Sequence, residues 1–196
     1  MRNGEYYFAE AGTSSYSDKK IRNYERSGSA HNIIQMALIK KYTNKESISW
    51  IEPVDVWDNF RAGRKAKIIE RNFGEDDKGN LWIIGAHDGF KKFGASHRRL
   101  IRIRSLNSSR LRLEVIDFIK TRKPMFVRQW WHLGLKVEKY YLEKIKSQIA
   151  SLHFLKGEII ETEIAEGFGV RKSRSSLSIN GILPEGEHIL SVDLII

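Results

Sequence analysis

The sequence predicts a mostly β protein that folds as an antiparallel β-sandwich. Short segments with a two-residue apolar alternation recur along the chain, and turn-forming residues separate them at intervals of roughly 8 to 12 residues. This spacing favours an antiparallel sandwich over a parallel sheet, whose crossover connections require helices. No linker rich in Pro, Gly or Ser divides the 196 residues, and only three prolines are present. We therefore expect residues 1–196 to form a single β-sandwich domain.

The predicted strands follow one another along most of the chain. The first strand-like segment is residues 5–9, near the N-terminus. Alternation is clearest in Leu-Arg-Leu-Glu-Val at 111–115 and in the series Leu133, Leu135 and Val137. The remaining predicted strands are residues 81–84, 100–103, 177–182 and 191–196. Turn signals are found at Asp-Lys-Gly-Asn 77–80, at 105–109, at Gly157 and at Pro-Glu-Gly 184–186.

One segment departs from the strand pattern. Apolar residues recur every fourth position at Val137, Tyr141, Ile145 and Ile149, and polar residues fill the positions between them. This period predicts one short helix near residues 137–150. A strand, a polar turn and a second strand fit the same residues, so the sequence leaves both alternatives open.

Composition excludes several classes of protein. The hydrophobic content of 41% is too high for a wholly disordered chain, which cannot bury enough apolar surface to offset its entropy. The absence of cysteine excludes a disulfide scaffold and a zinc module built on thiolates. The net charge of +10 predicts a polyanionic partner, either nucleic acid or an acidic polysaccharide.

The sequence gives no indication of a membrane segment. Its purely apolar runs contain four residues or fewer, whereas a helix needs about 20 to cross a bilayer. The N-terminus lacks the apolar stretch of a signal peptide. We expect a soluble protein, periplasmic or extracellular if an upstream signal has been lost, and cytoplasmic otherwise.

The common cofactor and hydrolase motifs are also missing. The six histidines include no His-Glu-x-x-His pair, and the chain contains neither a phosphate-binding Gly-Lys-Ser/Thr loop nor a Gly-x-Ser-x-Gly elbow. Gly167-Phe168-Gly169 lacks the third glycine of a dinucleotide site.

The first 35 residues contain the most informative group of polar side chains. Glu10, Tyr16, Tyr24, Arg26 and His31 lie within 22 positions on a backbone rich in Gly and Ser. An arginine can bind a carboxylate in a bidentate manner, and a tyrosine can stack on a sugar or share a proton. A glutamate and a histidine can together bind a divalent metal. The group fits a site for an acidic sugar, and a polar hairpin loop with a capped histidine is the alternative.

Five segments, in order, resemble the C-terminal domain of heparinase II/III-like polysaccharide lyases. The first segment lies within residues 10–32 and contains Glu-Ala-Gly-Thr-Ser-Ser-Tyr 10–16, Arg26-Ser27 and Ala-His-Asn 30–32. The later ones are Trp57 with Phe-Arg-Ala-Gly-Arg-Lys-Ala 60–66, His-Asp-Gly-Phe 87–90, His-Arg-Arg 97–99 and Trp-His-Leu 131–133. The family shows an Asp-Pro-Gly-Thr stretch that ends in Tyr, then an Arg-Ser/Thr pair and His-Asn-Thr. The resemblance covers about residues 5 to 135 and is weaker beyond them.

This resemblance implies a fold, a reaction and a metal. Family members join an N-terminal helical toroid to a C-terminal β-sandwich, and they cleave uronic-acid-containing glycans, heparin-, heparan- or alginate-like, by β-elimination. A structural zinc lies near the cleft, bound by a His-x-His histidine, an Asp and the His of His-Asn-Thr. By match, His31 would be a zinc ligand, Glu10 takes the place of the Asp, and Tyr16, Tyr24 and Arg26 would line the substrate site. The first histidine ligand would lie upstream of Met1.

The same resemblance predicts that this chain is inactive alone. β-Elimination requires neutralisation of the sugar carboxylate, a base for the C5 proton and an acid for the leaving oxygen. In the family these groups come largely from the toroid and the His-x-His segment, so we assign no catalytic residue. We expect the C-terminal portion of a lyase, which needs a toroid domain or partner chain and binds acidic polysaccharide.

Two rival functions remain. One is a non-catalytic carbohydrate-binding module for acidic glycans. The other is a nucleic-acid binder, which is favoured by charge alone because no RNA-recognition, KH or zinc-finger signature is visible. Nucleic acid is therefore not the expected partner.

Three further expectations concern single segments. Trp130 and Trp131 should point to opposite faces of a strand, one buried and one exposed. The basic segment 97–99 should be either a solvated strand start or a binding site for sulfate or carboxylate. The basic segment 171–174 should be solvated, and His87 should be a turn residue.

Overall fold

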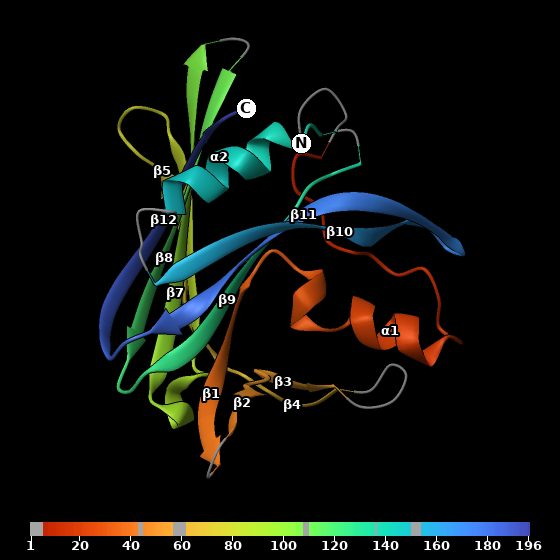
Figure 1. Ribbon diagram of the computed structural model, residues 1–196. Coiled ribbons are helices and arrows are strands. Elements are labelled where there is room, and N and C mark those ends of the chain that lie inside the picture. The colour runs from red at the N-terminus through yellow and green to blue at the C-terminus, as the bar shows by residue number, and fades with distance from the viewer. Residues whose placement is uncertain (1–5, 43–44, 57–61, 108–109, 136, 150–153) are drawn as a thin grey trace.

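The computed structural model describes residues 6–42, 45–56, 62–107, 110–135, 137–149 and 154–196. Within these residues the architecture is mostly β, as predicted, with two five-stranded antiparallel sheets packed face to face (Figure 1). The first sheet has the order β10-β11-β9-β1-β2, and the second has the order β12-β8-β7-β6-β5. A short β3–β4 pair lies beside them.

The element bounds are as follows. The first sheet contains β1 (Ile34–Tyr42), β2 (Lys45–Trp50), β9 (Met125–His132), β10 (Leu155–Gly167) and β11 (Val170–Leu183). The second contains β5 (Ile68–Glu75), β6 (Leu81–His87), β7 (Ala95–Asn107), β8 (Arg110–Thr121) and β12 (Gly186–Ile195). The remaining elements are β3 (Val54–Val56), β4 (Ala62–Lys65), α1 (Lys19–Glu25), α2 (Tyr140–Ile149) and 3-10 turns at Gly28–Ala30 and Lys91–Phe93.

The helix predicted near residues 137–150 is confirmed as α2. Its apolar face buries Leu142, Ile145 and Ile149, and the helix packs mainly on β12 and β10. The four-residue apolar period therefore corresponds to a helix that packs against the sandwich. No helix in the described part of the chain is long and apolar enough to span a membrane.

The strand predicted over Leu133, Leu135 and Val137 is wrong. β9 ends at His132, Leu133 forms only an isolated bridge with Phe8, and the chain then turns toward α2. In the last part of β9 itself, both Trp130 (7% exposed) and Trp131 (4%) are buried. The expectation that one of these two tryptophans would be exposed is wrong as well, because other side chains cover this sheet on both faces at that point.

Two local expectations also need correction. Gly157, expected in a turn, lies inside β10 opposite Ile179. Helix α1 falls in a segment that carries no clear apolar period, and it is only two turns long. It begins where the Asp18 carboxylate accepts a hydrogen bond from the Ile21 N–H (3.0 Å), which is a standard N-cap interaction.

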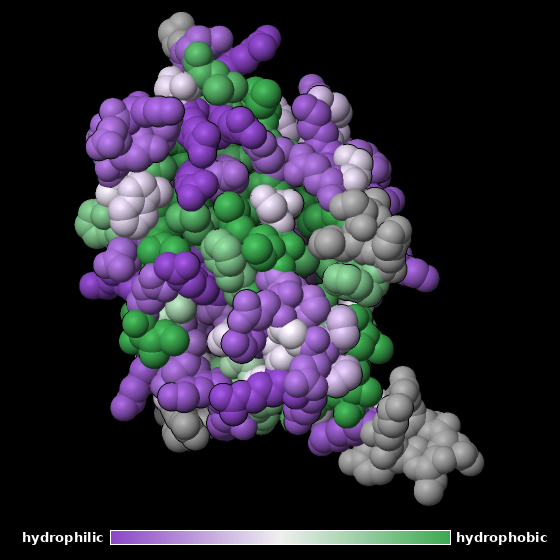
Figure 2. All heavy atoms as spheres, turned by 90° about the vertical axis from the view of Figure 1, so that its left-hand side faces the viewer, coloured by the Kyte–Doolittle hydropathy of each residue, from purple (hydrophilic) through white to green (hydrophobic). Residues whose placement is uncertain are grey.

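The first sheet covers only part of the second. A row of directly opposite residues crosses the second sheet from Val192 through Val115, Ile101 and Ile83 to Phe73. Val192 and Val115 belong to the core, at 1% and 5% exposure, whereas Ile83 is 48% and Phe73 is 78% exposed. One end of the row is therefore buried between the sheets, and the other is open at the β5 edge. Figure 2 views the molecule from the side of the second sheet and shows apolar surface gathered in its middle, surrounded by hydrophilic residues.

Candidate functional site

The predicted pair Glu10 and His31 is in direct contact. The Glu10 carboxylate is hydrogen-bonded to the His31 ring at Nδ1, and its other oxygen accepts a hydrogen bond from the Asn32 N–H (3.2 Å). Partial burial alone would raise the pKa of Glu10, but the hydrogen bonds from His31 and Asn32 outweigh burial and hold that pKa below its ordinary value. Glu10 is therefore an ionised, oriented carboxylate.

Asn32 fixes this pair to the sandwich. Its amide nitrogen donates to the carbonyl oxygen of Ala9 (3.2 Å) and to Glu10 (3.3 Å). Its side-chain oxygen accepts a hydrogen bond from the His132 N–H (2.7 Å) at the end of β9, and its carbonyl oxygen accepts one from Arg99 (2.6 Å). One side chain thus joins the segment of Glu10, the segment of His31 and the central strand of the first sheet.

A buried cation lies beneath Glu10. Arg174, in β11, is only 3% exposed, and its Nη1 donates to the carbonyl oxygen of Ala9 (2.6 Å). Burial lowers the pKa of Arg174, and the neighbouring Tyr24 and Glu10 counteract part of this effect. The expectation that residues 171–174 form a solvated basic face is therefore wrong at Arg174. The reason is that Arg174 lies on the face of β11 opposite the core residues Leu177 and Ile179, and the segment of Ala9 and Glu10 covers that face.

His132 forms a second buried polar group near Arg174. Its Nδ1 is hydrogen-bonded to the Ser176 hydroxyl (2.6 Å), and its ring stacks on Trp130 with centroids 5.4 Å apart. Burial and the charge of Arg174 lower the pKa of His132 to about 4. In the described part of the chain, Nε2 of His132 has no hydrogen-bond partner. The ring is neutral at physiological pH.

The predicted substrate residues lie around α1. The Tyr24 hydroxyl points at the carbonyl oxygen of Glu163 (3.5 Å) in β10. Tyr24 lines a groove of about 650 Å³ between α1 and the β10–β11 hairpin, together with Lys20, Ile21, Glu161, Thr162, Glu163 and Arg171. Arg26 follows directly after α1, where its N–H bonds to the carbonyl oxygen of Arg22 (3.2 Å) and closes the last turn.

Tyr16 belongs to an exposed aromatic pair that sequence reasoning missed. Its ring packs against Phe168 with centroids 5.3 Å apart, and the Arg22 guanidinium lies 5.4 Å from the Tyr16 centroid. Tyr16 is 50% and Phe168 69% exposed. Phe168 lies at the tip of the β10–β11 hairpin, so only the fold brings it beside Tyr16; its position in Gly167-Phe168-Gly169 was the only signal in the sequence.

The segment that carries Glu10 lies against this hairpin. The Ala165 N–H donates to the carbonyl oxygen of Ala11 (2.7 Å), and the Gly169 N–H donates to that of Ser14 (2.8 Å). Gly12, with φ +73°, passes so close that an added Cβ would lie 3.2 Å from the Cβ of Ala165. Backbone hydrogen bonds therefore attach the Glu10 segment to the hairpin.

Glu10 and His31 are suitable metal donors but do not make a complete site. A carboxylate oxygen and an imidazole nitrogen are both common zinc ligands, and structural zinc normally has four ligands. Among the described residues, no group of three or more His, Asp or Glu side chains is placed to bind one ion. The pair therefore offers one carboxylate and one imidazole, two of the four donors that a structural zinc site needs.

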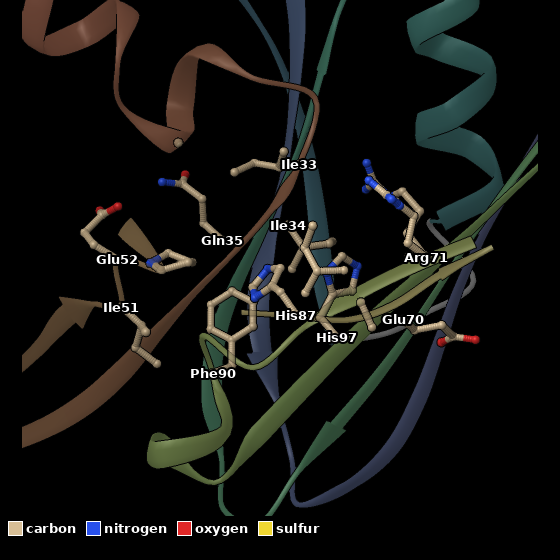
Figure 3. Close-up of a pocket in the computed structure, with 16 residues that line it drawn as sticks. Ile33, Ile34, Gln35, Ile51, Glu52, Glu70, Arg71, His87, Phe90 and His97 are labelled. Carbon is tan, nitrogen blue, oxygen red and sulfur yellow. The ribbon is translucent and has the colours of Figure 1, made fainter. Parts of the chain in front are cut away.

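A separate cavity of about 390 Å³ opens between the sheets (Figure 3). Its walls are mainly apolar, and Figure 3 shows His87 and His97 beside Phe90, with Glu52 and Arg71 at opposite sides. His87, expected in a turn, is instead the last residue of β6, opposite Ile68. Its Nδ1 accepts a hydrogen bond from the Gly89 N–H (3.1 Å), and burial lowers the pKa of His87. Burial also raises the pKa of Glu52.

A buried carboxylate lies below this cavity. Asp117 in β8 is fully buried and accepts hydrogen bonds from Arg99, from His97 (2.7 Å) and from Gln129 (2.7 Å). Burial would raise the pKa of Asp117, but Arg99 and His97 outweigh it and lower the pKa to about 2. The alternative of a solvated strand start at 97–99 is thus wrong for His97 and Arg99. Only Arg98 points outward, where it pairs with Glu70 (2.6 Å).

Comparison with known proteins agrees with the predicted fold and with the family that the sequence resembles. Residues 1–187 match the family described as "Heparinase II/III-like, C-terminal". The chain belongs to this family. Of the predicted family segments, Trp57 and residues 60–61 lie outside the described residues.

Solved structures provide independent support for the family fold. The heparinase III BT4657 gene product with methylated lysines aligns at a TM-score of 0.60 and 13% identity, over 98% of this chain and 28% of its own. The heparan sulfate lyase HepC from Pedobacter heparinus aligns at a TM-score of 0.56 and 13% identity, over 96% of this chain and 28% of its own. This heparinase II/III-like chain thus spans somewhat more than a quarter of the length of these enzymes. No curated protein sequence matches it.

Proposed function

We propose that residues 1–196 act as a single β-sandwich domain, the C-terminal portion of a polysaccharide lyase that cleaves uronic-acid-containing glycans by β-elimination. The observation that carries this proposal is the Glu10–His31 pair, held by Asn32 beside the groove of Tyr24. We further propose that the chain alone is inactive, because it spans only 28% of the length of the lyases it resembles.

In this proposal Glu10 and His31 contribute two ligands to a zinc site that a preceding domain or partner chain completes. When bound, the zinc would supply fixed positive charge and hold the two parts of the enzyme together at the cleft. The chain's own role is orientation. Asn32 restrains both ligands, and the carbonyl oxygens of Ala9 and Glu10 are held from below by Arg174.

The glycan would bind on the side of α1 and the β10–β11 hairpin. Tyr16 and Phe168 offer exposed aromatic faces on which a sugar ring can stack. Arg26, and the basic residues of the Tyr24 groove, would bind the carboxylate or sulfate groups of the substrate. The net charge of +10 favours such an anionic chain by raising its local concentration.

The test is the appearance of unsaturated uronate products, measured by ultraviolet absorbance, on heparan sulfate, heparin and alginate. We expect no product from the chain alone and product when it is fused to the N-terminal toroid of a heparinase III relative. The variant His31→Ala in the fusion should lose most activity and bind less than one zinc per chain. Absence of product from the fusion, on all three glycans, would contradict the lyase assignment.

The same experiment addresses the alternative, a carbohydrate-binding module without catalysis. The exposed Tyr16–Phe168 pair is the observation that favours it. Glycan binding that survives both His31→Ala and chelation of metal, without product in any fusion, would identify the chain as such a module.

A further inference from the structure

The open end of the second sheet is apolar. Along the row that begins in the core at Val192, the fraction exposed rises to 48% at Ile83 and 78% at Phe73. A neighbouring row behaves in the same way, since Leu194 is 1%, Ile103 is 38% and Leu81 is 53% exposed. These side chains share the face that packs against the first sheet elsewhere. They form a continuous apolar surface that ends at β5.

Strand β5 is also a free edge. In the part of the chain that the structure describes, its only strand partner is β6, so its other side presents unpaired backbone N–H and C=O groups. Natural edge strands are usually protected by Pro, by Lys or by a covering segment. The sequence of β5, Ile-Ile-Glu-Arg-Asn-Phe-Gly-Glu, contains neither residue.

The side chains along this edge are self-complementary. Arg71, Phe73 and Glu75 lie on one face of β5, because alternate residues of a strand point the same way. Among the described residues, neither Arg71 nor Glu75 forms an ion pair, although Arg98, Arg99, Arg102 and Arg112 of the same sheet all do. Phe73 is the most exposed large hydrophobic residue described in the chain.

An antiparallel pairing of two β5 strands about Phe73 gives each of these three side chains a favourable partner in the other copy. In that register Phe73 lies opposite Phe73 of the other copy, and each Arg71 lies opposite a Glu75. Aromatic pairs and opposite charges are the cross-strand combinations that stabilise sheets. A shift of two residues places Arg71 opposite Phe73 and leaves Glu75 opposite Ile69, so only the register centred on Phe73 pairs both charges. On the other face Glu70 approaches Asp76, but Arg98 already neutralises Glu70 through two hydrogen bonds.

We propose that the β5 edge is a homodimer interface, through which two copies of this chain join their second sheets by antiparallel β5–β5 pairing about Phe73. The contact is isologous, so the dimer closes and does not propagate into a fibre. Charge complementarity argues for a second copy as the occupant, because the arrangement Arg-x-Phe-x-Glu is its own complement when reversed.

The test uses charge reversal, with mass measured by sedimentation velocity across a micromolar concentration series. We expect a concentration-dependent dimer for the unaltered chain, and monomers for Arg71→Glu and for Glu75→Arg, since each variant places like charges opposite one another twice. An equimolar mixture of the two variants should form a heterodimer, because every pair is then again of opposite charge. The double variant Arg71→Glu/Glu75→Arg should recover the homodimer. The matched control is Arg122→Glu, because Arg122 is an exposed arginine that directly follows β8 and lies outside β5. This variant should still dimerise.

Loss of folding cannot mimic this pattern, because two misfolded variants would not recover dimerisation when mixed. Far-ultraviolet circular dichroism of each variant should match that of the unaltered chain. A monomer at all concentrations for the unaltered chain, or a mixture of the two single variants that stays monomeric, would overturn the proposal.

Discussion

The buried carboxylate of Asp117 accepts hydrogen bonds from Nε and Nη2 of Arg99 (2.7 and 2.9 Å), and Nη1 of the same guanidinium donates to the carbonyl oxygen of Asn32. The Arg99–Asp117 pair of the second sheet is thus joined by one hydrogen bond to Asn32, the residue that holds Glu10 and His31. The position of the candidate site depends on this connection between the sheets.

We predict that Asp117→Asn lowers the free energy of unfolding by about 3–5 kcal/mol, because it leaves the partly buried Arg99 and its neighbour His97 without their fully buried carboxylate partner. The measurement is urea unfolding at neutral pH. Asp193→Asn is the control, since it breaks a partly exposed pair with Arg112 and should cost no more than about 1 kcal/mol. Equal losses in the two variants would contradict the role assigned to Asp117.

Asp117 also affects acid stability. Its pKa in the folded protein is about 2, below its ordinary value of 3.8, so the folded state favours the ionised form. The stabilisation is therefore complete above pH 3.8 and is lost as the pH falls through about 2. In Asp117→Asn this part of the pH dependence should disappear from the unfolding free energy.

His132 should produce a different pH dependence. Its pKa falls from 6.5 to about 4 on folding, so the unfolded chain binds a proton more readily between these values. We predict that stability decreases as the pH falls from 6.5 toward 4. His132→Asn, whose side chain can still bond to Ser176, should flatten that slope. Chemical unfolding at several pH values measures it, and an unchanged slope in the variant would contradict the prediction.

Gly181 is required by close backbone packing. A Cβ at this position would lie 2.0 Å from the carbonyl oxygen of Phe154, which is backbone and cannot rotate away. We predict that Gly181→Ala lowers the free energy of unfolding by about 1–3 kcal/mol. Gly167→Ala is the matched control, because an added Cβ there has no neighbour within 4 Å, and its effect should stay within about 0.5 kcal/mol. Thermal unfolding of the two variants in parallel distinguishes them.

The aromatic pair at the hairpin tip should contribute to glycan binding. We predict that Phe168→Ala weakens binding to a uronic-acid oligosaccharide about tenfold, or about 1.4 kcal/mol, since it removes one of the two stacking faces. Ile189→Ala is the control, because Ile189 is also an exposed hydrophobic residue (58%) but lies on β12 of the other sheet. Calorimetric titration measures both affinities. Equal affinities for the two variants would show that the Tyr16–Phe168 pair is not part of the glycan site.

Much of the architecture is readable from the sequence because alternation and turn residues act locally. The strands at 100–103 and 111–115 follow from two-residue alternation, and the strand at 81–84 follows from an apolar run between turn residues. The four-residue apolar period near 137–150 fits the helix α2, although that period alone also allowed two strands joined by a turn. Helix α1 was missed because two turns carry too little periodicity, and its start depends on the single cap at Asp18.

The site was only partly readable. The contact of Glu10 with His31 follows from two segments 21 residues apart, and the family pattern anticipates it. The supporting residues are a different case. Arg174, His132 and Phe168 reach the site only because β9, β10 and β11 are adjacent in the first sheet, and no local pattern in a single sequence encodes that adjacency.

The attachment of residues 11–14 to the β10–β11 hairpin has a consequence for anyone who exchanges parts between family members. A hairpin of different shape, transplanted from a relative, would move the backbone N–H groups at positions 165 and 169 that hold the Glu10 segment, even though more than 150 residues separate the two in the chain. A graft that is chosen to change glycan specificity would therefore also shift Glu10, a proposed metal ligand. Residues 10–14 and the β10–β11 hairpin should be exchanged together.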